Sequence, residues 1–153
     1  MLTGDINKAF DFDDNYLPPM TLRSGNEVDN YSDILPFDAL LDEPTDEYLE
    51  SYYDGINYLD TGSWKHYLPI LINFTLRNYT TNTSMVIDSF VSSLRPPDRE
   101  PPRLKTLNKQ QEDIIVKVLD ILAFDEKSIC KEEAILALEE YWAPGALYRG
   151  NDT

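Results

Sequence analysis

Apolar side chains recur at helical spacing over most of residues 45–149, and this pattern predicts four to five helices. The first helix begins after Thr45, whose hydroxyl can cap it, and its acidic first turn suits the positive end of the helix dipole. Its apolar stripe lies within residues 48–53, and Gly55 offers a stop. The next helix has Ser63 as its cap and is apolar almost all round, which is typical of a central helix.

Prolines shape the second and third predicted helices. Pro69 lacks the backbone N–H that a helix interior uses, and its ring crowds the carbonyl four residues earlier. We therefore expect either a kink or a short turn over 63–67, followed by a helix that starts near Pro69. The third helix has Asn82 as its cap and ends at the pair Pro96-Pro97.

The last two helices carry clear local signals. Asn108 followed by Gln111 has the spacing of a capping box, so a helix should begin there. The fifth helix is predicted over about 127–142, and the sequence Ala143-Pro144-Gly145 stops it. Its predicted buried face consists of Cys130, Ala134, Ala137, Leu138 and Tyr141.

Residues 1–44, which we call the leader, show no sustained periodicity and collect turn-forming residues. They predict an extended segment with turns that wraps the rest of the protein. The stretch TLRSGNEV at 21–28 has the spacing of a small hairpin closed by a loop that contains Gly25. The apolar residues expected to hold the leader against a core are Phe10, Phe12, Leu17, Leu35, Phe37 and Leu40.

Helices joined by short links predict a mainly α protein: a single compact bundle of four to five helices with an extended acidic N-terminal segment. The predicted division is an acidic leader over 1–44, packed on the core, and a helical domain over 45–149. A chain of 153 residues buries about 68–70% of its unfolded surface, so it can fold alone. No internal repeat is visible, which argues against a solenoid.

Acidic residues are concentrated in the first two fifths of the chain. The full net charge is −15, and residues 1–62 carry 15 Asp and Glu against only Lys8 and Arg23. Such a field repels nucleic acid and anionic membranes, and it attracts basic partners at a salt-dependent rate. We therefore expect no direct binding of nucleic acid and no membrane association.

The sequence predicts a cytoplasmic protein. It has no apolar run of the roughly 18 residues that a membrane span needs, and its first residues lack the order of a signal peptide. Its single cysteine, Cys130, fits a reducing compartment, because secreted domains of this size commonly carry an even set.

The densest charge lies in LLDEPTDEYLESYYDGINYLDTG, residues 40–62, which holds seven carboxylates, four tyrosines and no Lys or Arg. A solvated face that keeps the protein in solution is one interpretation. We favour an interaction surface, because the acids lack lysine partners at i,i+4 and tyrosine is enriched in interface cores. The predicted partner-binding residues are Asp42, Glu43, Asp46, Glu47, Glu50, Tyr52, Tyr53, Asp54 and Asp60.

Candidate chemistry is sparse. His66 is the only histidine, and without a neighbouring nucleophile or a positioned carboxylate we favour a structural role for it over a catalytic one. Cys130 is interpreted as a small core residue. DFDDN at 11–15 matches the start of a calcium loop, but Tyr16 stands where the turn needs glycine and Leu22 where a glutamate belongs. We predict no metal, no cofactor and no catalytic residue.

The only basic patch predicted from the sequence lies at residues 95–109. Its bases are Arg95, Arg99, Arg103, Lys105 and Lys109. The patch can bind an anionic partner, but we favour an internal clamp on the acidic leader, because Arg suits bidentate pairing with carboxylates. The pairs expected in that case join Arg99 or Arg103 to Glu47 or Glu50.

Three stretches resemble a family of small, uncharacterised bacterial proteins: SWKHYLPILINFTLRN, SLRPPDREPPRL and EEYWAPGALYR. The shared features are a Tyr-Leu-Pro helix, an Arg-Pro-Pro loop and a Trp-x-Pro-Gly ending, over about residues 35–149. The resemblance implies a mostly helical domain with no assigned reaction. In type rather than in motif, the chain is also similar to immunity proteins of bacterial toxin systems, which are small, cytoplasmic, acidic and without an active site.

These observations favour a non-enzymatic cytosolic binding protein, an immunity protein or inhibitor that occludes the basic active site of a bacterial toxin such as a nuclease. Carboxylates over 42–60 would mimic the anions that such a site receives, and Tyr52 and Tyr53 would anchor the complex. Two alternatives stay open: a small enzyme that uses His66 with a carboxylate, and a structural or regulatory subunit of a larger assembly. Self-association is also left open.

Overall fold

The computed structural model describes residues 3–81 and 84–149, and no strand occurs within these ranges. The α-helices are α1 (Thr3–Ala9), α2 (Leu22–Asp29), α3 (Asp46–Ser51), α4 (Thr61–Asn78), α5 (Met85–Ser93), α6 (Lys109–Phe124) and α7 (Lys131–Ala137). Shorter segments are the 3₁₀ helices η1 (Tyr53–Tyr58) and η2 (Leu104–Thr106) and the π-helix η3 (Leu138–Trp142). The mainly α class is therefore confirmed, whereas the helices outnumber the four to five predicted.

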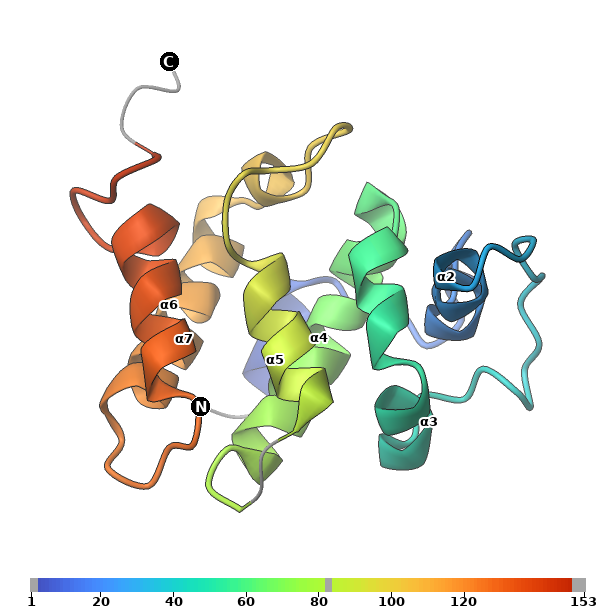
Figure 1. Cartoon of the computed structure of the whole chain (residues 1–153), viewed down its shortest axis with the longest axis horizontal. Helices are drawn as coiled ribbons and strands as arrows, with labels where there is room; N and C mark the ends of the chain where they lie inside the picture. Colours follow the sequence, from blue (N-terminus) through green and yellow to red (C-terminus); the bar gives the residue numbers. More distant parts are fainter. Residues whose placement is uncertain (1–2, 82–83, 150–153) are drawn as a thin grey trace.

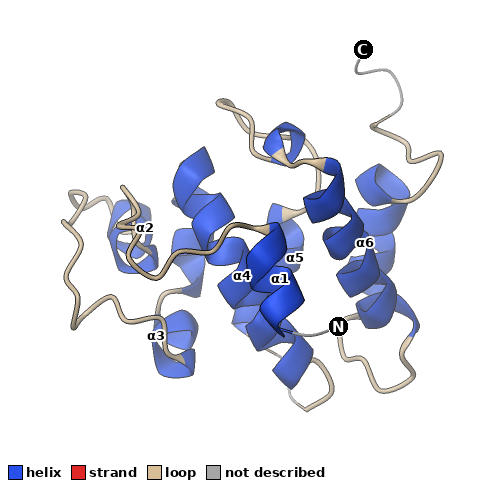
Figure 2. Cartoon of the chain, turned by 180° about the vertical axis from the view of Figure 1, so that it is seen from behind, coloured by secondary structure: helices blue, strands red, loops and turns tan. Residues whose placement is uncertain are grey.

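Helix α4 is the centre of the fold. In Figure 1, α5 lies beside it, with α6 and α7 at one end of the molecule and α2 and α3 at the other. Seen from behind in Figure 2, α1 crosses in front of α4. Trp64, Leu68 and Leu71 of α4 are completely buried. The prediction of a largely apolar central helix in this part of the chain is confirmed.

The start of α4 and its proline differ from the prediction. Asp60, not Ser63, is the N-cap, because its carboxylate accepts hydrogen bonds from the N–H (3.2 Å) and the hydroxyl (2.5 Å) of Ser63. The helix then continues through Pro69, and the alternative of a turn over 63–67 is wrong. Pro69 is buried, so packing around it offsets the backbone hydrogen bond that it cannot make.

The leader is not an extended segment, because α1 and α2 both lie within it. The stretch predicted as a hairpin forms α2, and Thr21 caps this helix by accepting a hydrogen bond from the Ser24 N–H at 3.0 Å. The two helices have seven and eight residues. Such helices are shorter than the window of about 11–18 residues in which helical periodicity is recognised.

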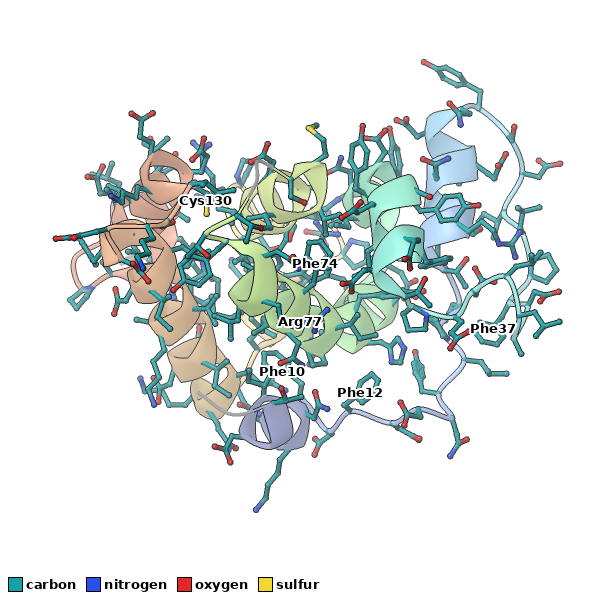
Figure 3. The ribbon with its side chains drawn as sticks, turned by 90° about the horizontal axis from the view of Figure 1, so that it is seen from below. Phe10, Phe12, Phe37, Phe74, Arg77 and Cys130 are labelled. Carbon is teal, nitrogen blue, oxygen red and sulfur yellow. The ribbon has the colours of Figure 1, made fainter. Side chains whose placement is uncertain are left out.

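Only some apolar residues of the leader pack onto the core. Phe10 is buried, and Phe12 and Leu35 are partly buried. The residues that are exposed against the prediction are Leu17 (61%), Phe37 (36%) and Leu40 (89%). Figure 3 shows the contrast: Phe10 lies where α1 meets the helical body, and Phe37 lies toward the outer edge of the molecule. The leader therefore leaves apolar side chains at the surface.

Two of the predicted helix caps are confirmed. Thr45 caps α3 by accepting a backbone N–H at 3.1 Å, and Asn108 and Gln111 form the predicted reciprocal capping box of α6. Helix α3 ends earlier than predicted, at Ser51, and Gly55 lies inside η1 instead of stopping a helix.

The third and fifth predicted helices also begin at other residues. Asn82, the predicted third cap, lies outside the described residues, and α5 begins after Ser84, whose hydroxyl accepts a backbone N–H at 3.2 Å. The fifth helix starts at Lys131 rather than near 127, because Cys130 is its N-cap. Its predicted buried face is confirmed, since Cys130, Ala134, Ala137, Leu138 and Tyr141 are all at most 6% exposed.

Two glycines let α2 approach η1 at backbone contact distance. A Cβ atom at Gly25 would lie 2.6 Å from the Gly55 oxygen, and a Cβ atom at Gly55 would lie 2.1 Å from the Leu22 oxygen. Real Cβ atoms do not come within 3.0 Å of such atoms, so a side chain at either position forces the two backbones apart. The docking of α2 on the body therefore requires glycine at this crossing.

We expect Gly55→Ala to lower the free energy of unfolding by about 1–3 kcal/mol, because overpacking a tight contact forces backbone shifts of that cost. Urea denaturation measures the change. Gly4→Ala is the matched control, since nothing lies within 4 Å of a Cβ atom at that position. Equal stability of the two variants would contradict the tight crossing of α2 and η1.

Candidate functional site

A buried carboxylate lies near the end of the leader. The side chain of Asp42 is completely excluded from solvent (0%). Arg23 of α2 meets it side-on, with Nε 3.1 Å from Oδ1 and Nη2 2.9 Å from Oδ2. The Tyr48 hydroxyl donates to Oδ1 at 2.8 Å, and the Asp38 N–H donates to Oδ2 at 2.9 Å. Asp42, predicted to face a partner, is therefore part of the protein's own interior.

The surroundings of Asp42 keep it charged. Burial raises the pKa of this carboxyl group, but the hydrogen bonds that it accepts, first from Arg23, outweigh burial and hold the pKa below its ordinary value. Tyr67 of α4 adjoins the same network, and its hydroxyl accepts the Leu22 N–H at 3.3 Å. Burial raises the pKa of Tyr67 to about 12, so it stays protonated.

Three acids of the predicted surface are exposed, and their carboxylates have no ion pair or hydrogen bond within the described ranges. They are Glu43, Glu47 and Glu50, which we call the acidic surface. Two other predicted acids are engaged with the protein itself. Asp46 pairs with Arg77 of α4 at 2.7 Å, and Asp60 caps α4. The acidic surface is therefore narrower than the sequence suggested.

The predicted anchor tyrosines are packed against the body. Tyr52 meets Tyr48 edge-on, with ring centroids 5.0 Å apart. Tyr53 lines a cavity of about 330 Å³ together with Glu50. Both tyrosines are partly buried, as is the neighbouring Asp54. Each therefore offers only part of its surface to a partner.

A cavity of about 370 Å³ lies between the leader and α4, and we call it the aromatic pocket. Its ring-bearing lining residues are Phe12, Tyr16, Phe37, His66 and Tyr67. The His66 ring packs against three of the others, at centroid distances of 5.0 to 5.4 Å. Asp14 and Glu43 also line the pocket, and both are exposed, so carboxylates lie at its edge.

His66 is held in this pocket by ring contacts. Burial lowers the pKa of the imidazole, against the opposing effect of Asp13 and Asp14. In the part of the chain that the structure describes, His66 forms no hydrogen bond with a carboxylate. A catalytic pair needs such a contact, or one through a water molecule. If the protein is an enzyme that uses His66, its histidine is neutral and has no carboxylate positioned beside it among the described residues.

The aromatic pocket has the chemistry of a cation site. Aromatic ring faces attract ammonium and guanidinium groups, and carboxylates at the edge add direct electrostatic attraction. Leu17 and Phe37 line the pocket, while Leu40 and Leu41, 89% and 58% exposed, follow in the same leader segment. Figure 3 shows Phe12 and Phe37 in the same part of the molecule. Exposed apolar groups of this kind are typical of interaction surfaces.

The aromatic pocket is not visible in the sequence, because its walls come from three separated segments. They are residues 12–18, 37–44 and 66–70. Only the stretch FDFDDNY at 10–16, in which aromatic and acidic residues alternate, gave a signal. Part of that stretch, DFDDN at 11–15, also matches the start of a calcium loop, so its pattern does not single out a pocket.

The ion pairs predicted between the basic loop and Glu47 or Glu50 are not formed within the described residues. Arg95 instead pairs with Glu140 of η3, with Nε 2.6 Å from Oε1. Arg103 donates to two backbone carbonyls of η1 and the residue that follows it, at 3.2 and 3.3 Å. The loop is therefore fixed to the body by its arginines, but not through the acidic surface.

Three other features complete the comparison with the sequence. Cys130 is 3% exposed and burial raises the pKa of its thiol, which confirms a core residue. Among the described residues, no helix is both long and apolar enough to cross a membrane. The same ranges contain no group of three or more His, Cys, Asp or Glu side chains arranged to hold a metal ion.

Fold and site together define a small helical protein with an acidic surface that adjoins an aromatic pocket. The chain belongs to a family of unknown function, DUF6714, whose model matches residues 2–146. This match confirms that the chain belongs to an uncharacterised family, and it begins at residue 2, well before the expected start near 35. Comparison with curated proteins and with solved structures found no match. The similarity to immunity proteins stays a prediction.

We expect Asp42→Asn to lower the free energy of unfolding by about 3–5 kcal/mol at neutral pH, because it leaves Arg23 without its counter-charge. The folded pKa of Asp42 lies below the ordinary value of 3.8. The stabilisation is therefore present above that value and is lost as pH falls through the folded pKa. Chemical denaturation between neutral pH and about pH 3 measures both effects.

The matched control for this variant is Glu43→Gln, which removes the charge of the adjacent, exposed acid. It should change stability by no more than about 0.5 kcal/mol. If Asp42→Asn is no more destabilising than Glu43→Gln, and keeps the wild-type acid dependence, the buried network does not stabilise the fold.

Proposed function

We propose that this protein binds a basic protein partner through the acidic surface and the aromatic pocket. The observation that carries the proposal is their juxtaposition at Glu43, which is one of the three unpaired acids and also lines the pocket. A Lys or Arg side chain of the partner enters the pocket, and neighbouring basic residues meet Glu47 and Glu50. The partner's charge then receives both aromatic and carboxylate contacts.

Electrostatic attraction supports the encounter. The net charge of −15 draws a basic protein from a distance, and the effect weakens as salt screens it. Contact then buries apolar side chains such as Leu40 and Leu41, which are exposed in the free protein. Charge thus accelerates association, and apolar burial slows dissociation.

More specifically, we propose that the protein is an inhibitor or immunity protein that covers the basic active site of a toxin, such as a nuclease, in the cytoplasm. A site that binds phosphate anions presents clustered Lys and Arg side chains. The three carboxylates of the acidic surface, one in the loop before α3 and two on α3, can occupy such a site as anions. The mechanism is occlusion, and it requires no reaction by this chain.

The two alternatives have less support. A small enzyme is favoured by the position of His66 in a cavity, but its carboxylate partner is absent from hydrogen-bonding distance among the described residues. A structural subunit is favoured by the exposed leader residues Leu40 and Leu41 alone. Neither alternative uses the unpaired carboxylates of the acidic surface. Binding of a basic protein uses these carboxylates, the aromatic pocket and the exposed leucines.

Charge reversal tests the acidic surface. We expect the triple variant Glu43→Lys, Glu47→Lys and Glu50→Lys to weaken binding of a labelled lysine-glycine repeat peptide by about tenfold or more at low salt. The loss should shrink as salt rises, because screening removes the attraction that distinguishes the two proteins. Fluorescence anisotropy at ionic strengths of about 0.01 M and about 0.15 M measures this.

A matched control changes the net charge equally at the far end of the molecule. It is the triple variant Asp120→Lys, Glu126→Lys and Glu132→Lys, at exposed positions in and between α6 and α7. The control should retain most of the affinity for the peptide. Equal losses in both triple variants would show a nonspecific charge effect and would refute the proposed surface.

A second variant tests the aromatic pocket separately. We expect Phe12→Leu, which keeps an apolar side chain but removes the ring, to weaken binding of a lysine-containing peptide by about two- to fivefold. A peptide with norleucine in place of that lysine should bind equally to both proteins. Isothermal titration calorimetry measures both affinities. An unchanged affinity for the lysine peptide would exclude the pocket as its binding site.

A further inference from the structure

A second charged cavity, of opposite sign, lies beside the proline-rich loop that rises above α5 in Figure 1. Its volume is about 340 Å³. The wall is made by η1, the end of α5 and the loop, and the polar lining residues that bear on its chemistry are Tyr58, Ser92, Arg95, Arg99 and Arg103. We call it the arginine pocket.

Arg103 is the most constrained of these residues. Only 5% of it is exposed, and its guanidinium carbon lies 5.2 Å from the centre of the Trp64 ring. Its Nη1 donates to the carbonyl oxygens of Ile56 and Leu59. Its Nε is buried and has no hydrogen-bond acceptor among the described residues. A buried N–H without an acceptor is costly, and a small shift of this side chain toward an anion in the pocket would supply one.

Two other arginines of the chain show which group binds the edge of a guanidinium that is formed by Nε and Nη2. Arg23 holds Asp42 through Nε and Nη2, and Arg95 holds Glu140 through the same pair of atoms. In Arg103 the single nitrogen Nη1 donates both hydrogen bonds to the carbonyls. No carboxylate of the described residues is hydrogen-bonded to the edge formed by Nε and Nη2. That edge matches two oxygens of a carboxylate or a phosphate group.

The acids nearest to this edge are already engaged. Asp98 lines the pocket, but its carboxylate accepts four backbone N–H groups, from Arg99, Arg103, Leu104 and Lys105. Glu140 is paired with Arg95. Arg99 is exposed and forms no ion pair in the described part of the chain. Arg99 and Arg103 therefore line the pocket without an ion pair in the described part of the chain, and the charge of Asp98 acts on Arg103 only from a distance.

The electrostatics of Arg103 agree with this geometry. Burial, followed by the charge of Arg99, lowers the pKa of Arg103 to about 10 against the opposing charge of Asp98. The group is still cationic at neutral pH, but its charge is held at a cost that an anion beside it would relieve. An isolated buried charge is expensive, so occupation of the pocket by an anion stabilises the folded protein.

We propose that the arginine pocket binds the phosphate group of a small phosphorylated molecule. Two guanidinium groups without an ion pair match the double negative charge of a phosphate monoester, with Arg99 contacting it at the outer side and Arg103 shifting slightly to contact two oxygens side-on. Arg99 also lines a neighbouring cavity of about 620 Å³ together with Tyr148, which leaves room for the remainder of the ligand. This anion site is separate from the acidic surface and does not depend on the function proposed there.

Inorganic phosphate is the probe for this site. We expect it to bind saturably and to raise the Tm of the protein, compared with sodium chloride at the same ionic strength. Arg99→Gln removes one charged contact at an exposed position, and we expect it to weaken phosphate binding by about tenfold or more. Isothermal titration calorimetry gives the affinities, and thermal unfolding gives the shift.

Two further variants make the result specific. Arg77→Gln removes an equal charge from an exposed arginine outside the pocket and should leave phosphate binding unchanged. Arg103→Lys keeps a charge but removes the two-pronged edge, so a folded variant should bind phosphate at least as weakly as Arg99→Gln does. If it does not fold, the Arg99→Gln comparison decides alone.

Three results would overturn the proposal. If phosphate gives no saturable binding and no rise in Tm beyond that produced by sodium chloride, the pocket does not bind a ligand of this class. Equal losses in Arg99→Gln and Arg77→Gln would show a general charge effect. Acetate that binds as tightly as phosphate would show that the doubly charged group is not what the pocket selects.

Discussion

The buried carboxylate of Asp42 is the contact on which the arrangement of the leader depends. A charge excluded from water is stable only when it is paired and fully hydrogen-bonded. Arg23 and Asp42 both belong to the leader, and Tyr48 comes from α3, so this network folds the leader back on itself and joins it to the first helix of the body. Asp42 and Tyr67 also line the aromatic pocket. The position of the pocket therefore follows from a buried ion pair.

The same pairing decides which acids remain free. Residues 1–62 contain two basic residues, and one of them, Arg23, is committed to a buried acid instead of a surface acid. Arg77 pairs with Asp46, but an exposed pair contributes only about 0–1 kcal/mol. Arg95 and Arg103 of the proline-rich loop are held by η3 and by backbone carbonyls, and Arg99 forms no ion pair with the acidic surface among the described residues. The charge of the acidic surface is therefore not neutralised by the arginines of this loop.

Sequence patterns predicted the contacts that lie within about one helical turn. The capping box of Asn108 works through a residue three positions later, and that spacing is visible in the sequence. The density of acids over 40–62 likewise predicted exposed carboxylates, of which the acidic surface is the unpaired part. Arg23 and Asp42, however, are 19 positions apart, and no local pattern assigns such partners. The continuity of α4 through Pro69 also depends on packing by other segments, which overrides local propensity.

Helix α4 explains why two sites of opposite charge coexist in one small chain. Trp64 and His66 are two positions apart, so a helix with 3.6 residues per turn directs them about 200° apart around its axis. Trp64 lies under Arg103 at the arginine pocket, and His66 lines the aromatic pocket. A helix is about 10–12 Å across, which is comparable with the screening length of about 8–10 Å near physiological salt. The loop arginines are thereby kept from the leader acids, and this separation depends on an unbroken α4 through Pro69, because a turn over 63–67 would remove it.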